Sequence, residues 1–152
     1  MSKLGKYFTL EELTVTNENI DNTPVDLAKQ KLKALVKNLL DPAREMYGFP
    51  IYVNSGFRTL AVDKAIGGST KPISQHTKGE AADLECADNA KLFYLIRDNF
   101  DFDQLIWEEG NNLQPDWVHV SYKAKRNRKQ ILKFKNKKKY HSLKNNKYEN
   151  NN

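Results

Sequence analysis

The strongest constraint on the fold of this chain is a change in the spacing of its apolar residues. Between residues 32 and 47 the apolar side chains recur every three or four positions, the spacing of a helix with one buried face. Thr23 and Pro24 predict the start of this helix. Pro42 predicts a kink within it, and Gly48 predicts its end. We therefore expect a long helix that packs against a core through Leu32, Leu35, Val36, Leu39, Leu40, Ala43, Met46 and Tyr47.

Beyond residue 50 the pattern changes to short strand-like segments separated by turns and short helices. At 152 residues the chain is long enough for one domain with a hydrophobic core and too short for two of ordinary size. Helices that are segregated from several short strands predict an α+β fold, with a small antiparallel sheet packed against the helices. Strands are predicted at residues 51–53, 81–85, 104–108 and 117–122, and helices at residues 7–13, 60–66 and 90–97.

Charge is distributed unevenly and divides the chain into two parts. Residues 123–152 contain 12 Lys and Arg residues and a single acid, Glu149, whereas the remaining residues contain 13 basic and 18 acidic ones. The net charge of +6 therefore belongs to the C-terminal end and not to the body. A Lys- and Asn-rich composition of this kind predicts disorder. We therefore assign residues 1–134 to a folded domain and residues 135–152 to a basic tail without fixed structure.

Composition also excludes several classes of protein. The single cysteine, Cys86, excludes an internal disulfide framework and a cysteine-rich zinc site, and we interpret it as a packing residue. No apolar run approaches the roughly 18 residues that a membrane-spanning helix needs. Residues 1–9 lack the apolar segment of a secretory signal peptide. We therefore expect a chain that is made in the cytoplasm and has no membrane span.

Two of the three histidines lie in segments whose residues suit a metal site. In the first segment, residues 74–83, the positions of His76 and Asp83 allow a loop carrying the histidine to fold over a strand carrying the aspartate. Gly79 would let the backbone approach a crowded site closely. Neutral imidazole and carboxylate groups both bind zinc. The third histidine, His141, lies in the basic tail and is interpreted as a solvated side chain.

The second segment, residues 115–122, has the alternation of a strand. This alternation places Trp117, His119 and Ser121 on one face. Asp116 stands three positions before His119, so in a regular strand the two side chains would point to opposite faces. We therefore expect Asp116 in the turn before the strand, where its carboxylate can lie beside a metal ion without binding it.

Together the two segments offer the ligands of a catalytic zinc site. Two imidazoles and one carboxylate leave the fourth tetrahedral position for water, whose pKa zinc lowers to about 7. A neighbouring carboxylate such as Asp116 can then accept the proton. Each residue also has a structural interpretation: His119 as a hydrogen-bonded strand residue, and Asp83 as a turn or capping residue. Spacing and chemistry alone leave both interpretations open.

The complete motif resembles that of a known family. Residues 74–83 match the pattern SxHxxGxAxD at every defined position, and a carboxylate stands three residues before His119. The chain thus resembles the zinc D-alanyl-D-alanine carboxypeptidases and the related phage L-alanyl-D-glutamate endolysins, whose fold is shared with Hedgehog signalling domains. The likeness extends from about Tyr7 to about Leu132 and includes residues 53–58, 66–68 and 103–108.

The resemblance implies a metal site and a general base. His76, Asp83 and His119 would bind one Zn²⁺, and Asp116 would take the proton of the attacking water. Many relatives have a glutamate as the base, but the shorter aspartate also occurs in the endolysin branch. No acyl-enzyme is expected, because no activated Ser or Cys nucleophile is apparent in the sequence.

The resemblance also implies substrate contacts. Arg58 would bind substrate and help to stabilise the oxyanion, since a fixed guanidinium can hydrogen-bond a carboxylate or a developing alkoxide. Ser74 would support the substrate through its hydroxyl. Gln104 and Glu108 are interpreted as residues that pack beside the site or support its ligands, and Trp107 as a core residue.

The function implied by the resemblance is hydrolysis of peptide bonds in bacterial peptidoglycan stem peptides by a monomeric zinc peptidase. Either the D-Ala-D-Ala or the L-Ala-D-Glu bond fits this chemistry. The small size suggests a phage-encoded enzyme that acts on the cell wall after release or as part of the virion. One alternative is a non-catalytic binding module that keeps the zinc fold. Another is binding of nucleic acid or anionic envelope polymers through the tail, although the acidic body carries no specific nucleic-acid motif.

Overall fold

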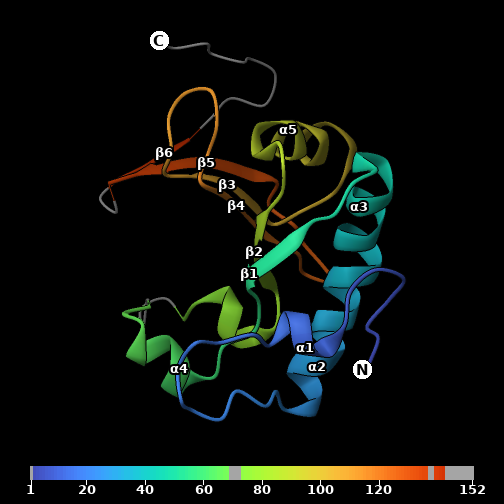
Figure 1. Ribbon diagram of the computed structural model, residues 1–152, viewed down its shortest axis with the longest axis vertical. Helices are drawn as coiled ribbons and strands as arrows, with labels where there is room; N and C mark the ends of the chain where they lie inside the picture. Colours follow the sequence, from blue (N-terminus) through green and yellow to red (C-terminus); the bar gives the residue numbers. More distant parts are fainter. Residues whose placement is uncertain (1, 69–72, 137–138, 143–152) are drawn as a thin grey trace.

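The computed structural model of the chain describes residues 2–68, 73–136 and 139–142, which form an α+β fold (Figure 1). Six strands form one sheet in the order β1-β2-β4-β3-β5-β6. The α+β prediction is confirmed. The sequence predicted an antiparallel sheet, but β3 and β5 pair in parallel. They do so because the chain crosses back after β4. The strands are β1 (Tyr52–Ser55), β2 (Ala81–Glu85), β3 (Gln104–Glu108), β4 (Trp117–Ser121), β5 (Gln130–Lys135) and β6 (Lys139–Ser142).

Helices surround this sheet, and α3 and α5 pack against each other beside it (Figure 1). Helix α5 also contacts β3 and β4, the strands at the centre of the sheet. No helix in the described part of the chain is both long and apolar enough to cross a membrane. The helices are α1 (Leu10–Leu13), α2 (Asp26–Leu35), the π-helical turn η1 (Val36–Leu40), α3 (Asp41–Tyr47), α4 (Leu60–Ala65), the 3-10 helix η2 (Gln75–Lys78) and α5 (Asn89–Asn99).

The predicted long helix is present as the continuous run α2-η1-α3. Its apolar stripe is buried from Leu32 to Tyr47 apart from Met46, which is largely exposed. The predicted kink at Pro42 takes the form of the π-helical turn η1, in which the N–H of Asp41 bonds the carbonyl of Val36. Proline crowds the carbonyl one turn before it, and a widened turn relieves that clash.

The two ends of this run are determined by local contacts. The N-terminal prediction is wrong by a few residues: α2 begins at Asp26, because the hydroxyl of Thr23 donates to the carboxylate of Asp21 and does not cap the helix. At the other end, Gly48 adopts the left-handed conformation with φ of 84°, as expected of a glycine that ends a helix.

The central strands have one apolar face and one polar face. Leu84, Val118 and Val120 are fully buried in the core beneath the helices. Alternate residues of β2 and β4, among them Asp83 and His119, face the opposite side. The hydrophobic core therefore fixes the strands whose other face carries the candidate ligands.

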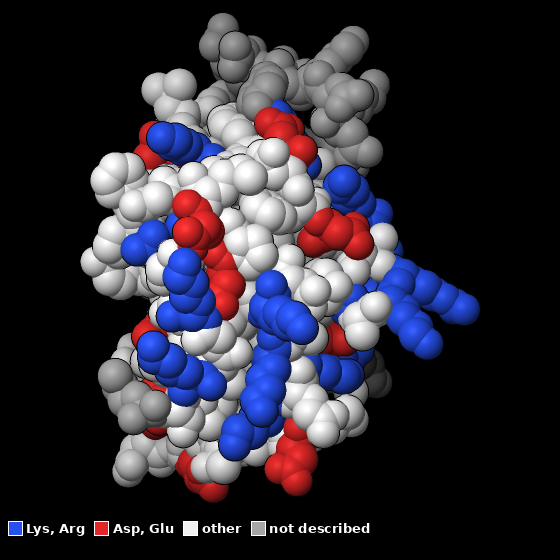
Figure 2. All heavy atoms as spheres, turned by 90° about the vertical axis from the view of Figure 1, so that its right-hand side faces the viewer, with Lys and Arg blue, Asp and Glu red and all other residues white. Residues whose placement is uncertain are grey.

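The basic C-terminal segment contains more regular structure than its composition predicted. Lys139–Ser142 form β6, which pairs antiparallel with β5, so the boundary drawn at residue 134 falls inside a β-hairpin. Lys135 is the last residue of β5. Residues 137–138 and 143–152, and the side chain of His141, lie outside the described residues. Basic side chains are not confined to this segment: they also cover much of the face that includes α2, with acidic side chains among them (Figure 2).

Candidate metal centre

His76 is held in place by the short 3-10 helix η2. Ser74 caps this helix, and its Oγ accepts a hydrogen bond from the backbone N–H of His76 at 3.2 Å. Gly79 ends the helix in a left-handed conformation and packs on α2, where a Cβ atom would lie 2.4 Å from the carbonyl oxygen of Ala28. The glycine therefore allows close approach to α2, and not to the metal site as the sequence suggested. With both ends of η2 fixed, His76 is buried at a defined position.

Asp83 and His119 come from adjacent strands and are direct cross-strand partners. Partners of this kind project on the same face of the sheet, with their Cβ atoms about 5 Å apart. On the other side of β2, Ser55 of β1 is the partner of Asp83. The predicted strand alternation is thereby confirmed for both candidate ligands.

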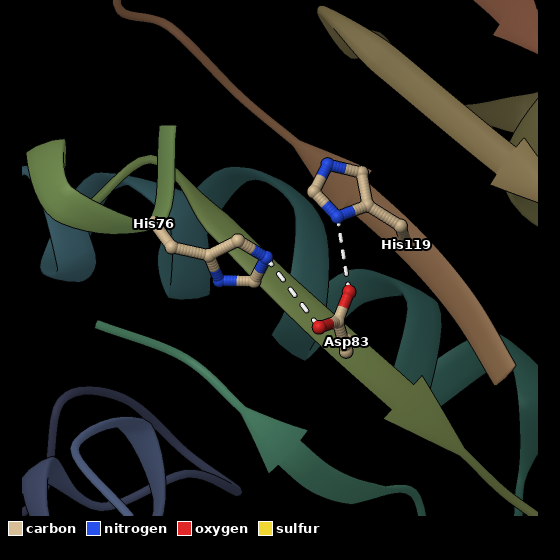
Figure 3. Close-up of side chains that lie close together, drawn as sticks. All are labelled: His76, Asp83 and His119. Atoms are coloured by element: carbon tan, nitrogen blue, oxygen red, sulfur yellow. Dashed lines mark hydrogen bonds and ion pairs between the residues drawn. The ribbon is translucent and has the colours of Figure 1, made fainter. Parts of the chain in front are cut away.

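The three side chains converge with the aspartate between the two histidines (Figure 3). Asp83 Oδ2 lies 3.4 Å from Nε2 of His76, and Asp83 Oδ1 lies 3.0 Å from Nδ1 of His119. The two imidazole rings are 5.1 Å apart between centroids. One ligand atom from each residue lies within 4.8 Å of the other two, a spacing that one metal ion can bridge.

The protonation of His76 supports a cation at this place. Its Nδ1 lies 2.7 Å from the carbonyl oxygen of Gly56, which can only accept, so Nδ1 carries the proton and Nε2 presents a lone pair. Burial lowers the pKa of His76, although the charge of Asp83 opposes this shift, so the imidazole is neutral at pH 7. The lone pair on Nε2 of His76 and Oδ2 of Asp83 then face each other at 3.4 Å. A cation between these two atoms would stabilise this arrangement.

Asp83 is ionised and ready to bind a metal ion. Burial opposes ionisation, but the two neighbouring imidazoles outweigh it and hold the pKa of Asp83 well below its usual range. Two nitrogen donors and one carboxylate, with one imidazole oriented by a backbone carbonyl, suit zinc in composition and in hydrogen bonding. The residues therefore fit the metal ion that the sequence predicted.

Arg58 lies beside this cluster. Its backbone N–H donates to the carbonyl oxygen of His76 at 3.1 Å, and its side chain is only 14% exposed. The positive charge of Arg58 is close enough to His76 to contribute to the lowering of that residue's pKa. The structure thus brings together four of the six predicted site residues.

The other two predicted residues are near the cluster in the chain but outside the ligand set. The hydroxyl of Ser74 caps the helix that carries His76, so the structure gives it a supporting role. Asp116 occupies the turn before β4, as expected, where its backbone N–H donates to the carbonyl oxygen of Glu108 at 2.9 Å. The side chain of Asp116 is exposed to solvent. Their roles toward substrate remain predictions.

The structure draws attention to a carboxyl group that the sequence assigned only to support or packing. Ile106 is the cross-strand partner of His119, and Glu108, two residues further along β3, projects on the same face. Burial raises the pKa of Glu108 to about 7; His119 opposes this shift and Asp83 adds to it. Only the register of β3 against β4 reveals this proximity, since the motif around His119 does not include Glu108.

Comparison with known proteins agrees with the site. The model of the family Peptidase M15 matches residues 6–121, which include the three ligands, Arg58 and Asp116. No curated protein matches the chain. The match covers well over half of the sequence and contains every residue of the metal cluster. The chain belongs to the Peptidase M15 family, whose members are zinc-dependent peptidases.

Proposed function

We propose that this protein is a zinc peptidase that hydrolyses peptide bonds in bacterial peptidoglycan stem peptides. The observation that carries the proposal is the convergence of His76, Asp83 and His119 with Arg58 beside them. Three protein ligands leave one position open in a tetrahedral site, which is the arrangement of a catalytic metal and not of a structural one. The proposed activity includes cleavage of either the terminal D-Ala-D-Ala bond or the L-Ala-D-Glu bond of the stem peptide.

The chemistry divides between the metal and the residues around it. A zinc ion held by His76, Asp83 and His119 would act as a Lewis acid, which would lower the pKa of water and polarise a carbonyl group. The guanidinium of Arg58 donates hydrogen bonds to the substrate and to the oxygen on which charge develops. Asp116 accepts the proton of the attacking water and returns it to the leaving amine.

The first test separates metal binding from proton transfer. Asp116→Asn should retain one zinc ion but lose about 10²- to 10⁴-fold in kcat, the usual range for removal of a general base. His119→Ala should lose both zinc and activity, because it removes a ligand. Zinc content by atomic absorption and cleavage of purified muropeptides measure the two properties.

Glu108→Gln is the matched variant, because Glu108 is a carboxyl group on the same face of the sheet as His119 and is not a candidate metal ligand. It should keep activity within a few-fold if Asp116 is the base. An active Asp116→Asn enzyme together with an inactive, zinc-loaded Glu108→Gln enzyme would transfer the role of base to Glu108.

The substrate is tested on whole peptidoglycan. Zinc-loaded protein should expose new amino termini in purified sacculi or release free D-alanine from them. A chelator should abolish both. Mass spectrometry of the digest identifies the bond. Zinc-loaded protein that leaves every stem peptide intact would favour a binding module without hydrolysis.

A further inference from the structure

Arg58 forms a buried ion pair beside the metal cluster with Asp63, a residue that has no part in the mechanism above. Nη1 of Arg58 lies 3.4 Å from Oδ1 of Asp63, and the two side chains are 14% and 3% exposed. A carboxylate is rarely buried to this degree unless it is paired. The buried carboxylate of Asp63 is therefore paired with the guanidinium of Arg58. Arg58 is in turn the residue that would contact the substrate.

Asp63 belongs to an element that is fixed at its start. It lies in the first turn of α4, where its backbone N–H bonds the carbonyl of Thr59. Thr59 caps the same helix by accepting a hydrogen bond from the N–H of Val62. The N–H of Thr59 donates in turn to the side chain of Asn22. Since Thr59 directly follows Arg58 in the chain, these contacts fix the distance between guanidinium and carboxylate.

Gly68 closes the other side of the carboxylate. Its N–H bonds the carbonyl of Asp63 at 2.8 Å, and a Cβ atom at this position would lie 2.2 Å from Oδ1 of Asp63. No larger residue fits unless the buried carboxylate moves. The carboxylate of Asp63 is therefore confined from two directions, with the guanidinium of Arg58 as its charged partner.

The pair is held by charge and not by a hydrogen bond. Among the described residues, neither Nε of Arg58 nor Oδ1 of Asp63 has a hydrogen-bond partner, although both atoms are buried. Unsatisfied buried polar atoms are rare and costly in folded proteins. The contact between the guanidinium and the carboxylate is therefore one of charge, with Nη1 of Arg58 as the nearest donor atom.

We propose that Asp63 is a positioning residue, which holds the guanidinium of Arg58 beside the metal centre so that it can bind an oxygen atom of the substrate. This inference rests on the proposed function, because it assigns Arg58 to substrate. It makes Asp63 and Gly68 parts of the active-site support, although neither belongs to the metal-binding motif.

A double-mutant cycle tests whether Asp63 acts through Arg58. In zinc-loaded protein, Asp63→Asn should lower kcat/KM about tenfold or more, with the same division between kcat and KM as Arg58→Gln. Added to Arg58→Gln, the Asp63→Asn change should cost less than about twofold, since its target is already gone. Equal losses in the two backgrounds, or a single variant within about twofold of the wild type, would overturn the proposal.

Asp41→Asn is the control for a purely structural loss. The carboxylate of Asp41 accepts hydrogen bonds from the backbone of Lys6 and Tyr7, far from Arg58 in the chain. This variant should lower Tm and leave kcat/KM unchanged. If Asp41→Asn lowers kcat/KM as much as Asp63→Asn does at a similar loss of Tm, the loss in Asp63→Asn is structural and the proposal fails.

A second measurement does not depend on hydrolysis. The Nε–H signal of Arg58 in a ¹H–¹⁵N spectrum, assigned by its absence in Arg58→Gln, should shift in Asp63→Asn. It should also shift in Gly68→Ala, which displaces the carboxylate without changing any charge. An unmoved signal in both variants would refute the positioning role. If the wild-type protein cleaves no peptide while the signal shifts, the proposed function fails and the ion pair stands.

Discussion

A single hydrogen bond, from Nδ1 of His76 to the carbonyl oxygen of Gly56 at 2.7 Å, decides which nitrogen of this residue can bind a metal ion. The backbone carbonyl cannot donate, so the proton is fixed on Nδ1 and the lone pair on Nε2 faces Asp83. The same arrangement is common among zinc-binding histidines, because it orients the ring and raises its basicity toward the metal. The ligand is therefore oriented before the ion binds.

This tautomer can be measured in metal-free protein. Burial lowers the pKa of His76, so the ring takes up a proton only when the pH falls below its ordinary value of 6.5. We expect a neutral ring with the proton on Nδ1 at pH 7, seen in long-range ¹H–¹⁵N correlation spectra of the imidazole. A doubly protonated ring at pH 7, or a proton on Nε2, would contradict the assignment.

At the scale of single residues, the sequence predicted the ligands but not their support. His76, Asp83 and His119 could be identified because their spacing belongs to a recognisable motif. Asp63 was not identified, because it stands in no motif, and Glu108 was assigned only to packing or support. Their importance depends on contacts between α4 and the preceding loop, and on the register of β3 against β4. Such contacts follow from tertiary packing, which a spacing along the chain does not contain.

Among the elements, prediction succeeded where local pattern and tertiary environment agree. The bounds of β2 and β3 were predicted correctly, because both are short apolar segments between clear turn signals. Strand β5 was missed. Its buried Ile131 and Leu132 are surrounded by basic residues, and its partner β3 is distant in the chain. The π-helical turn before Pro42 was likewise expected only as a kink.

The connection from β4 to β5 is anchored on the buried Asp103. Its carboxylate accepts hydrogen bonds from the backbone and the guanidinium of Arg128, and from the side chain of Gln75 beside His76. Burial opposes ionisation, but the contacts with Arg128 outweigh it and lower the pKa of Asp103 from 3.8 to about 2. This network links the connection between β4 and β5 to η2, the element that carries His76.

The pKa of Asp103 gives the network a defined dependence on pH. Because the folded-state pKa is depressed, its contribution to stability is complete above about pH 4 and is lost as the pH falls toward 2. Asp103→Asn should therefore cost about 1–2 kcal/mol at pH 7, a figure reduced for the half-exposed Arg128. Urea unfolding of both metal-free proteins between pH 7 and pH 2 measures this difference. A difference that does not shrink at low pH would exclude the ionised carboxylate as its source.

At the scale of the whole molecule, charge is arranged on more than one surface. The described α2-η1 run carries Lys29, Lys33 and Lys37 at intervals of about one helical turn, and Figure 2 shows basic side chains on the face of the molecule that includes α2. The C-terminal segment adds the consecutive residues Lys137, Lys138 and Lys139. The charge counts predicted a basic tail, but they average over the surface and therefore do not reveal the helical stripe.

The lysines of the C-terminal segment and those of the α2-η1 surface allow a matched test of attraction to anionic envelope polymers. Replacing Lys137, Lys138 and Lys139 by Gln should slow lysis of purified cell walls at low salt about two- to tenfold and leave cleavage of small peptides unchanged. Replacing Lys29, Lys33 and Lys37 by Gln removes the same charge from the other surface and should have a smaller effect. Equal effects of the two triple variants, or equal losses on walls and on small peptides, would exclude a specific role for the C-terminal lysines.

The alternation of β2 and β4 between core and ligand residues has a consequence for assembly of the protein. A slip of one residue between these strands would turn one of them over, so that Asp83 and His119 would point to opposite faces of the sheet. We therefore expect that only chains with the correct register can bind a metal ion through His76, Asp83 and His119. We expect the number of zinc ions bound per chain to report the fraction of chains with correctly paired strands, without the use of a substrate.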